Sequence, residues 1–528
     1  MTIIEDSANK QIARSAGKVM IALLISNIVN LVSLILNATT FGTQAEMDAF
    51  LAANRVTETL FLLMAGGALG SAFIPTFTGL LTKGERSPAW RLASAIGNLV
   101  LIVLTLAALL LAIFAQPLVH YVLAPGFAND PGQEALAVDL LRIMLPSVVI
   151  FGLSGLVMGI LNSHQVFFIP ALTPAMYRLG MIFGVLCLVP TMGIYGLAWG
   201  VVIGSCLHLV LQLPSLLRLK GIYFPTLGLK LPEVRQVGLL MLPRVFGVAA
   251  VQINFWVNVR LASLMSEGSI TGITWGLTMM LMPQAIIAQS VAMAALPTLS
   301  AQYALNKIDD LRHSLAASLR GILFLAIPAS VGLLLLGQPI VALLLQYGNF
   351  TEESTQLISW ALLWYSAGLV GHCIVEILAR AFYAMQNTKT PVFVGAAAMG
   401  LNVFFSVLFS GWFYRMGWMP LGGLALANSV ATGLEAVCLF FLMRRRLAGL
   451  EGMYIFEGTG KAVLSMVVMA LVLWGWLGMT TDQPVWMVGI GGVVLGGAVY
   501  GLCMLLLRVP EVETVVNLLK RRLKPVFK

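Results

Sequence analysis

The sequence predicts an all-α polytopic membrane protein with fourteen transmembrane helices: two parallel six-helix bundles around a central cleft, plus two C-terminal helices. Three observations predict this fold class. Of the 528 residues, 59% are apolar and only 10% are charged, which is outside the range of soluble domains. The apolar residues fall in fourteen long runs, and short motifs recur at a nearly constant spacing. This composition excludes a soluble enzyme, a disordered chain and a nucleic-acid-binding protein.

Each apolar run is long enough to cross the hydrocarbon core of a bilayer, which takes roughly 20 helical residues. We expect spans over residues 17–41, 48–82, 90–122, 135–162, 168–191, 194–217, 236–265, 270–303, 312–346, 354–385, 390–412, 419–443, 460–480 and 484–507. The first run follows a polar segment, and no small-residue cleavage site follows a short apolar region. We therefore expect this run to be retained as a span and not removed as a signal peptide.

The distribution of lysine and arginine predicts the orientation of these spans. With the N-terminus in the cytoplasm, the segments on that side hold 23 basic residues, and the opposite loops hold only Arg415. Because cytoplasmic loops carry the excess of basic residues, both termini are predicted to lie in the cytoplasm. The net charge of +9 follows from this asymmetry, so no nucleic-acid partner is expected.

Internal motifs indicate a duplication. Gln116-Pro117-Leu118-Val119 recurs as Gln338-Pro339-Ile340-Val341, and Ile74-Pro75-Thr76-Phe77 recurs as Leu296-Pro297-Thr298-Leu299, both at the same offset along the chain. Matching hairpins end at Pro170 and Pro391. Three matches in one order are typical of duplicated units. Since each unit holds an even number of spans, both have the same orientation, about an axis along the membrane normal.

These patterns predict a domain organisation. The segments are a cytoplasmic N-terminus (1–16), an N-terminal six-helix bundle (17–217), a cytoplasmic linker (218–235), a C-terminal six-helix bundle (236–446), a cytoplasmic loop (447–459), two further helices (460–507) and a basic cytoplasmic tail (508–528). Two parallel bundles leave a cleft at their interface, and rocking of one bundle against the other gives alternating access. The predicted architecture favours a transporter.

Polar side chains within the first two spans are candidates for the wall of this cleft. The first span carries Ser26, Asn27, Asn30, Ser33 and Asn37, and the second carries Asp48, Asn54, Arg55 and Glu58. Hydrogen bonding between helices is the alternative role for the asparagines. For Arg55 and Glu58, at positions i and i+3, the alternative is an ion pair with each other. Both alternatives stay open at this point.

Other ionisable residues lie on later spans. Arg178, Arg244 and Arg260 lie on the fifth and seventh spans. Arg178 is further from a span edge and needs a partner or an anion, whereas Arg260 lies near a span end and can extend to the membrane surface. His208 and His372 are isolated, so we expect core roles and no metal site. The sequence shows no paired carboxylates on an exposed loop, no phosphate-binding glycine motif and no long soluble domain. We therefore expect no enzymatic activity.

Several motifs carry a family resemblance. They are Gly66-Gly67-Ala68-Leu69-Gly70-Ser71-Ala72-Phe73-Ile74-Pro75, Ala124-Pro125-Gly126-Phe127, Ile160-Leu161-Asn162 with Ile169-Pro170-Ala171, and Arg380-Ala381-Phe382-Tyr383-Ala384 with Thr388-Lys389-Thr390-Pro391. Over residues 17–446 the sequence resembles the MurJ (MviN) family of lipid II flippases, in the multidrug/oligosaccharidyl-lipid/polysaccharide exporter superfamily. The resemblance implies translocation of lipid II, the lipid-linked peptidoglycan precursor, from the inner to the outer leaflet of the cytoplasmic membrane by alternating access. Implied partners are a polyprenyl-diphosphate-linked glycan, membrane lipids and cell-wall synthesis proteins.

The resemblance also implies a site. The expected cleft residues are Ser26, Asn27, Asn30, Ser33, Asp48, Asn54, Arg55, Glu58, Gln252, Arg260 and Thr278. A cation site for a coupling sodium ion is expected at Asn258, Asn402, Ser406 and Asn428, with the membrane potential as the other energy source, and no cofactor is expected.

The sequence departs from the family pattern at charged positions. Arginines of the family's first, second and eighth helices fall here at Asn27, Ser33, Phe61 and Thr278, and neutral groups replace the carboxylates of the sodium site. A diphosphate in a low-dielectric cleft needs cationic partners, which asparagine cannot supply. Arg55, Arg178, Arg244 and Arg260 are the candidate replacements.

Three alternatives to a lipid II flippase stay open. They are a flippase for another polyprenyl-diphosphate-linked oligosaccharide, a cation or drug antiporter of the same superfamily, and a non-transporting scaffold that kept the fold. A membrane-embedded glycosyltransferase is disfavoured because the sequence shows no catalytic loop. A positive potential in the cleft would favour the diphosphate, and a negative one the cation.

Overall fold

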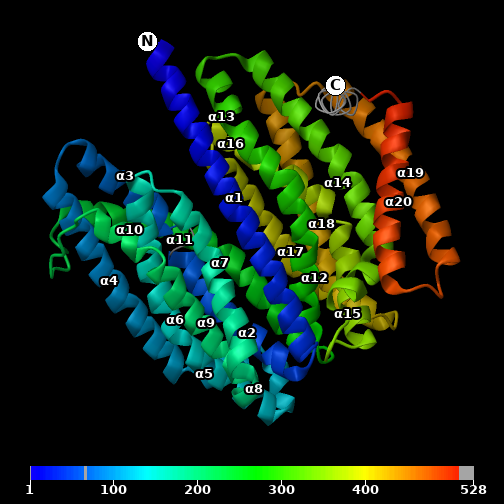
Figure 1. The fold of residues 1–528 in the computed structure, drawn as a ribbon, viewed down its shortest axis with the longest axis horizontal. Coiled ribbons are helices and arrows are strands. Elements are labelled where there is room, and N and C mark those ends of the chain that lie inside the picture. The colour runs from blue at the N-terminus through cyan, green and yellow to red at the C-terminus, as the bar shows by residue number, and fades with distance from the viewer. Residues whose placement is uncertain (1, 65–67, 510–528) are drawn as a thin grey trace, which may run out of the picture. The chain divides into compact units, whose positions relative to one another are not determined.

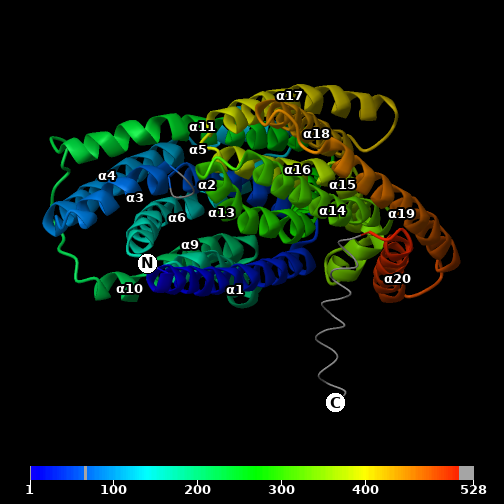
Figure 2. The ribbon, with the colours of Figure 1, turned by 90° about the horizontal axis from the view of Figure 1, so that it is seen from above.

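The computed structural model describes residues 2–64 and 68–509. This part of the chain contains helices and no strand (Figures 1 and 2), which confirms the all-α prediction. Gly66 and Gly67 of the glycine-rich motif, and residues 510–528 of the predicted basic tail, lie outside the described residues.

Contacts between helices divide the chain into two compact units. The first comprises Met1–Ile270 and Tyr347–Phe350. Its α-helices are α1 (Thr2–Phe41), α2 (Ala45–Met64), α3 (Ala68–Thr82), α4 (Arg86–Ile113), α5 (Ala115–Pro117), α6 (Pro131–Ser163), α7 (Phe168–Phe183), α8 (Val189–Met192), α9 (Ile194–Val210), α10 (Leu213–Arg218) and α11 (Pro232–Ser263). Two π-helical segments, η1 (Leu118–Leu123) and η3 (Gly184–Leu188), and the 3-10 helix η2 (Pro125–Asn129) complete this unit.

The second unit comprises Thr271–Gln346 and Thr351–Lys528. Its helices are α12 (Ser269–Gln284), η4 (Ala285–Gln289), α13 (Ser290–Ala304), α14 (Ile308–Leu345), α15 (Glu352–Ser366), α16 (Leu369–Ala384), α17 (Lys389–Arg415), α18 (Leu421–Arg446), α19 (Gly452–Met479) and α20 (Val485–Leu506). Within it, α17 and α18 run side by side, as Figure 2 shows.

The described helices provide twelve candidate membrane spans, or thirteen when the bent pair α15 and α16 is taken as one span. The predicted span 48–82 corresponds to α2 and α3. Of these, α2 carries the charged residues Glu46, Asp48, Arg55 and Glu58. A helix with this many charged residues is not recognised as a span by hydropathy alone. A multi-pass helical membrane protein is confirmed, whereas the count of fourteen is not.

The helix boundaries repeat along the chain with the spacing of the sequence motifs. Helices α3 and α13 begin and end at the same offset as these motifs, and α4 and α14 begin at that offset as well. Helices α7 and α17 begin at nearly the same offset. The repeat is not identical in detail, because α6 continues through Pro146 whereas its counterparts α15 and α16 meet at a 50° bend. The boundaries support the duplication.

One helix groups differently from the expected bundles. We predict the C-terminal bundle to begin at residue 236, which makes α11 its first span. In the structure α11 packs on α2, α3 and α4 and belongs to the first compact unit. The bundle limits 17–217 and 236–446 stay a prediction about the repeat. By its contacts, however, α11 belongs with the helices of the first unit.

Glycines allow α7 and α9 to approach closely. A Cβ atom on Gly180 would lie 2.2 Å from the Cα atom of Gly204, and one on Gly184 would lie 2.8 Å from the Cα atom of Gly200. Small residues at such crossings let backbones meet in membrane proteins, where van der Waals packing drives helix association. This pair of helices therefore depends on the absence of side chains at the crossing.

Helices α19 and α20 pack on α14 within the second unit (Figure 1). The guanidinium of Arg320 on α14 lies 4.2 Å from the centroid of the Tyr454 ring, at the start of α19. A Cβ atom on Gly458 would lie 2.6 Å from Arg320 Nε, so only glycine fits there without movement. Leu336, Met469 and Leu473 form the apolar contact between these helices.

We expect Gly180→Ala to destabilise the protein. The added methyl group meets backbone atoms of α9, which cannot rotate away, and overpacking of this kind costs about 1–3 kcal/mol. The melting temperature in detergent, followed by tryptophan fluorescence, measures the loss. Gly247→Ala on α11 is the matched control, because no atom lies within 4 Å of the added Cβ. Equal melting temperatures for the two variants would contradict the close crossing.

Candidate functional site

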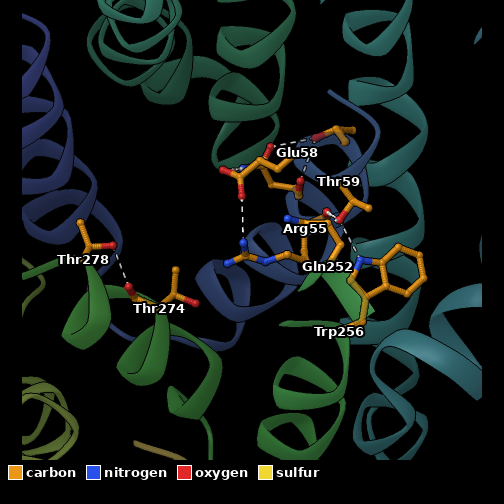
Figure 3. Close-up of polar contacts among 9 residues, drawn as sticks. Arg55, Glu58, Thr59, Gln252, Trp256, Thr274 and Thr278 are labelled. Carbon is orange, nitrogen blue, oxygen red and sulfur yellow. Dashed lines mark hydrogen bonds and ion pairs between the residues drawn. The ribbon is translucent and has the colours of Figure 1, made fainter. Parts of the chain in front are cut away.

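The candidate site is a group of side chains on α2 and α11, both in the first unit (Figure 3). We define the α2–α11 polar cluster as Asn54, Arg55, Glu58, Thr59, Gln252 and Trp256. On α2, Arg55 and Thr59 are four residues apart, and on α11, Gln252 and Trp256 are four residues apart. Residues at this spacing share one face of a helix, so each helix presents a short polar stripe.

An ion pair lies in the α2 part of the cluster. Arg55 Nη1 lies 3.2 Å from Glu58 Oε2, and Asn54 Nδ2 donates to Glu58 Oε1 at 3.0 Å. The side chains of Arg55 and Glu58 are 17% and 31% exposed. The charge of the arginine is thus balanced locally, as expected for an ionisable group within a span. This ion pair confirms the pairing alternative from the sequence, but it does not occupy all donors of Arg55.

Arg55 keeps hydrogen-bonding capacity beyond this ion pair. A guanidinium carries five N–H donors. Arg55 Nε is buried and has no hydrogen-bond acceptor among the described residues. The guanidinium also lies over the Phe255 ring of α11, 5.1 Å from its centroid. The aromatic face holds the cation without using its N–H groups, so Arg55 retains donors for an oxyanion.

Hydrogen bonds to a threonine join α2 to α11. Trp256 Nε1 donates to Thr59 Oγ1 at 2.9 Å, and Thr59 Oγ1 lies 3.4 Å from Gln252 Oε1. Figure 3 shows the indole and the amide of α11 converging on this hydroxyl. Gln252 and Thr59 are buried. These bonds place α11 beside the Arg55–Glu58 pair.

A second cation lies on α7, near the same face of α2. Tyr177 is within electrostatic reach of Glu58 and Arg178 and is next to Asn54. The Arg178 guanidinium lies 5.2 Å from the centroid of the Tyr177 ring. Arg244 on α11 is exposed and makes no ion pair within the described ranges. Arg178 and Arg244 are therefore further cations of the first unit, on α7 and α11.

Two predicted cleft residues hold backbone groups instead. Asp48 is 3% exposed, and its Oδ2 accepts the backbone N–H of Gly268 at 2.8 Å. Arg260 donates to the carbonyl oxygens of Tyr121 and Val122 in η1. Terminal carbonyl groups of a helix lack partners within the helix, so Arg260 satisfies the end of this π-helical turn. Neither residue belongs to the α2–α11 polar cluster.

The polar stripe of α1 changes from exposed to buried along the helix. Ser26 donates to the carbonyl of Ala22 at 2.9 Å, Asn27 is exposed and Asn30 is half-buried. Ser33 is buried, and its hydroxyl has no hydrogen-bond partner among the described residues. A cleft position for this stripe stays a prediction.

The residues of the expected cation site are engaged with neighbouring side chains. Ser406 donates to Asn402 Oδ1 at 3.0 Å, and Asn428 Oδ1 lies 3.0 Å from His372 Nε2. In the first unit, Asn258 Nδ2 donates to Asn254 Oδ1 at 3.3 Å. The described residues contain no group of three or more His, Cys, Asp or Glu side chains that could hold a metal ion. The expected cation site stays a prediction.

Thr278 also bonds locally, since its hydroxyl donates to the carbonyl of Thr274 at 2.8 Å (Figure 3). The residues that the sequence analysis missed are Thr59, Trp256 and Tyr177. None is charged, so residue type alone does not single them out. The four-residue spacing of Gln252 and Trp256 was the available signal, but it does not reveal the partner on α2.

Comparison with known sequences gives a consistent result. The family described as "Lipid II flippase MurJ" matches residues 37–491. A Vibrio cholerae protein described as "Probable lipid II flippase MurJ" is 31% identical over 465 residues, which cover 86% of each chain. A Burkholderia cenocepacia protein described as "Lipid II flippase MurJ" is 28% identical and covers 80% of this chain and 82% of its own.

Solved structures agree with these relatives. A structure described as "Lipid II flippase MurJ, inward closed conformation" superposes with a TM-score of 0.80 at 25% identity, covering 93% of this chain and 98% of the other. An inward-facing multidrug-resistance MATE transporter of the MOP superfamily superposes with a TM-score of 0.65 at 15% identity, covering 81% and 96%. This second similarity shows the fold alone.

We expect Asp48→Ala to destabilise the protein by about 1–3 kcal/mol, because it leaves the buried N–H of Gly268 without its acceptor. Asp48→Asn should lower the stability less, since the amide keeps an acceptor oxygen at the same position. Thermal unfolding in detergent measures both effects. Glu46→Ala, on the same helix turn but exposed, is the control. If Asp48→Ala and Glu46→Ala have the same melting temperature, the hydrogen bond to Gly268 contributes nothing to stability.

Proposed function

Because the chain belongs to the MurJ family of lipid II flippases, we propose that it recognises the diphosphate of its substrate through Arg55. The protein is a multi-pass inner-membrane flippase that translocates lipid II by alternating access. The identity of the anion-binding residues is the open question, since the sequence has neutral side chains at several family arginine positions.

One observation carries the proposal: Arg55 is a partly buried cation whose Nε has no acceptor among the described residues. A buried donor without a partner is uncommon in proteins. An oxyanion that reached this nitrogen would restore the missing bond. Charge-assisted hydrogen bonds from a guanidinium to phosphate oxygens are among the strongest in proteins, so a diphosphate suits this position.

The Arg55–Glu58 pair explains how such a cation is tolerated before substrate binds. Glu58 balances the charge, and Asn54 holds the other carboxylate oxygen. When a diphosphate approaches, Arg55 bonds to the phosphate, and Glu58 stays hydrogen-bonded to Asn54. The carboxylate competes with the substrate, which weakens binding enough for release on the other side of the membrane.

Arg178 and Arg244 are proposed to supply further positive charge. The diphosphate carries about two negative charges, so one arginine does not neutralise it. Arg178 lies beside Tyr177 near Glu58, and Arg244 is exposed on the helix that carries Gln252. Arg260 is a weaker candidate because η1 carbonyl groups occupy its guanidinium.

We further propose that both termini lie in the cytoplasm, because the basic residues are on that side of the predicted spans. Interaction with cell-wall synthesis proteins is part of the same proposal. Coupling to sodium or to the membrane potential also stays a proposal. The asparagines of the expected cation site bond to protein groups, so we assign no transport step to an ion.

Complementation tests the function directly. A bacterium depleted of its lipid II flippase should grow when it expresses this chain, and labelled lipid II should become accessible from outside the cell. Growth rescue without lipid II exposure would favour a different lipid-linked oligosaccharide. Failure of both, with the protein present in the membrane, would favour the antiporter or the scaffold.

We expect Arg55→Ala to abolish flipping while leaving the protein folded. Removing the partner of a desolvated charge costs roughly 3–5 kcal/mol, which is enough to eliminate binding of the diphosphate. Glu58→Gln should retain binding, because it frees Arg55 from its carboxylate. Lipid II binding to purified protein and complementation measure these effects.

Arg415→Ala is the control, because Arg415 is an exposed arginine at the end of α17. If Arg55→Ala and Arg55→Lys both transport, Arg55 serves only as the partner of Glu58. If Ala at Arg55, Arg178, Arg244 and Arg260, singly and together, leaves lipid II flipping intact, charge recognition by these arginines is wrong.

A further inference from the structure

A cavity in the first unit is lined by residues of α5, η1 and α6, none of which belongs to the α2–α11 polar cluster. Its volume is about 440 Å³, and Gln116, His120, Glu134, Asp139 and Arg142 supply its polar lining. We call it the α4–α6 pocket, because its lining residues belong to the segment that follows α4 and to the start of α6. Its volume is within the range of small-ligand sites.

The pocket combines acceptors for a cation with donors for an anion. His120 Nδ1 lies 3.0 Å from Glu134 Oε2, so the imidazole turns its Nε2 away from Glu134. Asp139 Oδ1 lies 3.9 Å from Arg142 Nη1, a long contact that leaves both groups about half exposed. Arg142 Nε donates to the carbonyl of Ala112 on α4 at 3.2 Å, which holds the guanidinium at the rim.

The position of Arg142 along α6 places the pocket at a membrane surface. Helix α6 has 33 residues. At about 1.5 Å per residue it is roughly 50 Å long, which is more than the ~30 Å of a hydrocarbon core. Residues 143–163 contain no Asp, Glu, Lys or Arg and are long enough to form the span. The hydrocarbon-spanning part of α6 then starts after Arg142 and not at residue 135 as the sequence predicts, which places the pocket at headgroup level.

The neighbouring end of α4 is apolar and exposed. Leu109, Leu110 and Ile113 are 56%, 56% and 69% exposed, and α4 adjoins the pocket through the Arg142–Ala112 bond. In a candidate span, exposed side chains of this kind face lipid chains. A polar pocket bordered by such a surface suits a ligand with a charged head and long apolar chains.

We propose that the α4–α6 pocket binds a phospholipid whose headgroup carries both a phosphate and a primary amine. The ammonium group donates to the carboxylates of Glu134 and Asp139, and Arg142 donates to the phosphate. The acyl chains run along the exposed leucines of α4. This site is separate from the proposed diphosphate site on α2 and would fix the protein in a bilayer of suitable composition.

The mixed lining distinguishes this headgroup from other common ones. A purely anionic headgroup would place negative charge beside two carboxylates with only one fixed cation in the pocket. A choline headgroup has the same net charge as the proposed ligand but no N–H to donate. Both would leave polar groups of the pocket without partners, which weakens binding.

The test uses the full chain reconstituted in vesicles with equal amounts of phosphatidylethanolamine, phosphatidylcholine and phosphatidylglycerol. Lipids that stay with the protein after mild detergent extraction are measured by mass spectrometry. We expect phosphatidylethanolamine to be enriched over both others. Glu134→Gln and Arg142→Gln should each lower that enrichment about five- to tenfold, as expected for the loss of a charge-assisted hydrogen bond.

Two exposed residues of the second unit, changed as Glu353→Gln and Arg415→Gln, are matched controls and should leave the enrichment unchanged. Melting temperatures show whether each variant is folded, and Asp139→Asn replaces Glu134→Gln if the latter unfolds. Equal retention of the three lipids would overturn the proposal. A preference for phosphatidylglycerol that only Arg142→Gln removes would overturn it as well, because that result describes a plain anion site.

Discussion

A polar group inside a membrane span has no water to pair with, and this constraint accounts for the partners of three arginines in the described spans. Arg55 lies against Glu58 at 3.2 Å, and Arg380 lies against Glu376 at 2.7 Å. Arg260 instead uses the carbonyl groups of η1. The two ion pairs lie within single helices, whereas Arg260 joins α11 to η1.

The same constraint gives α11 its place in the first unit. The indole of Trp256 and the amide of Gln252 meet the hydroxyl of Thr59 on α2, and the Phe255 ring covers the Arg55 guanidinium. Apolar surface alone does not hold two helices together in lipid, since the lipid chains offer equivalent contacts. Polar bonds and close glycine crossings supply the specificity that the hydrophobic effect supplies in water.

For a transporter, an arginine on α2 that keeps free N–H donors is more useful than an arginine whose donors are all occupied. An arginine that is paired, but still has free donors, is stable in the protein without substrate and can still bind phosphate. The neutral side chains on α1, such as Asn27 and Asn30, offer hydrogen bonds without charge. In this protein recognition of a diphosphate would thus shift from the first helix towards α2 and its neighbours α7 and α11.

The sequence by itself determined the all-α membrane class, most of the spans and the internal repeat, and it offered the pairing of Arg55 with Glu58 as one of two alternatives. Each depends on composition or on spacing along the chain, where geometry follows directly from residue number. Only the tertiary structure decided that Asp48 binds the backbone of Gly268, that Arg260 caps η1 and that Trp256 reaches Thr59. These partners are 220, 139 and 197 residues apart. Contacts at such separations depend on how whole helices pack, and helical periodicity carries no information about the partner across the interface.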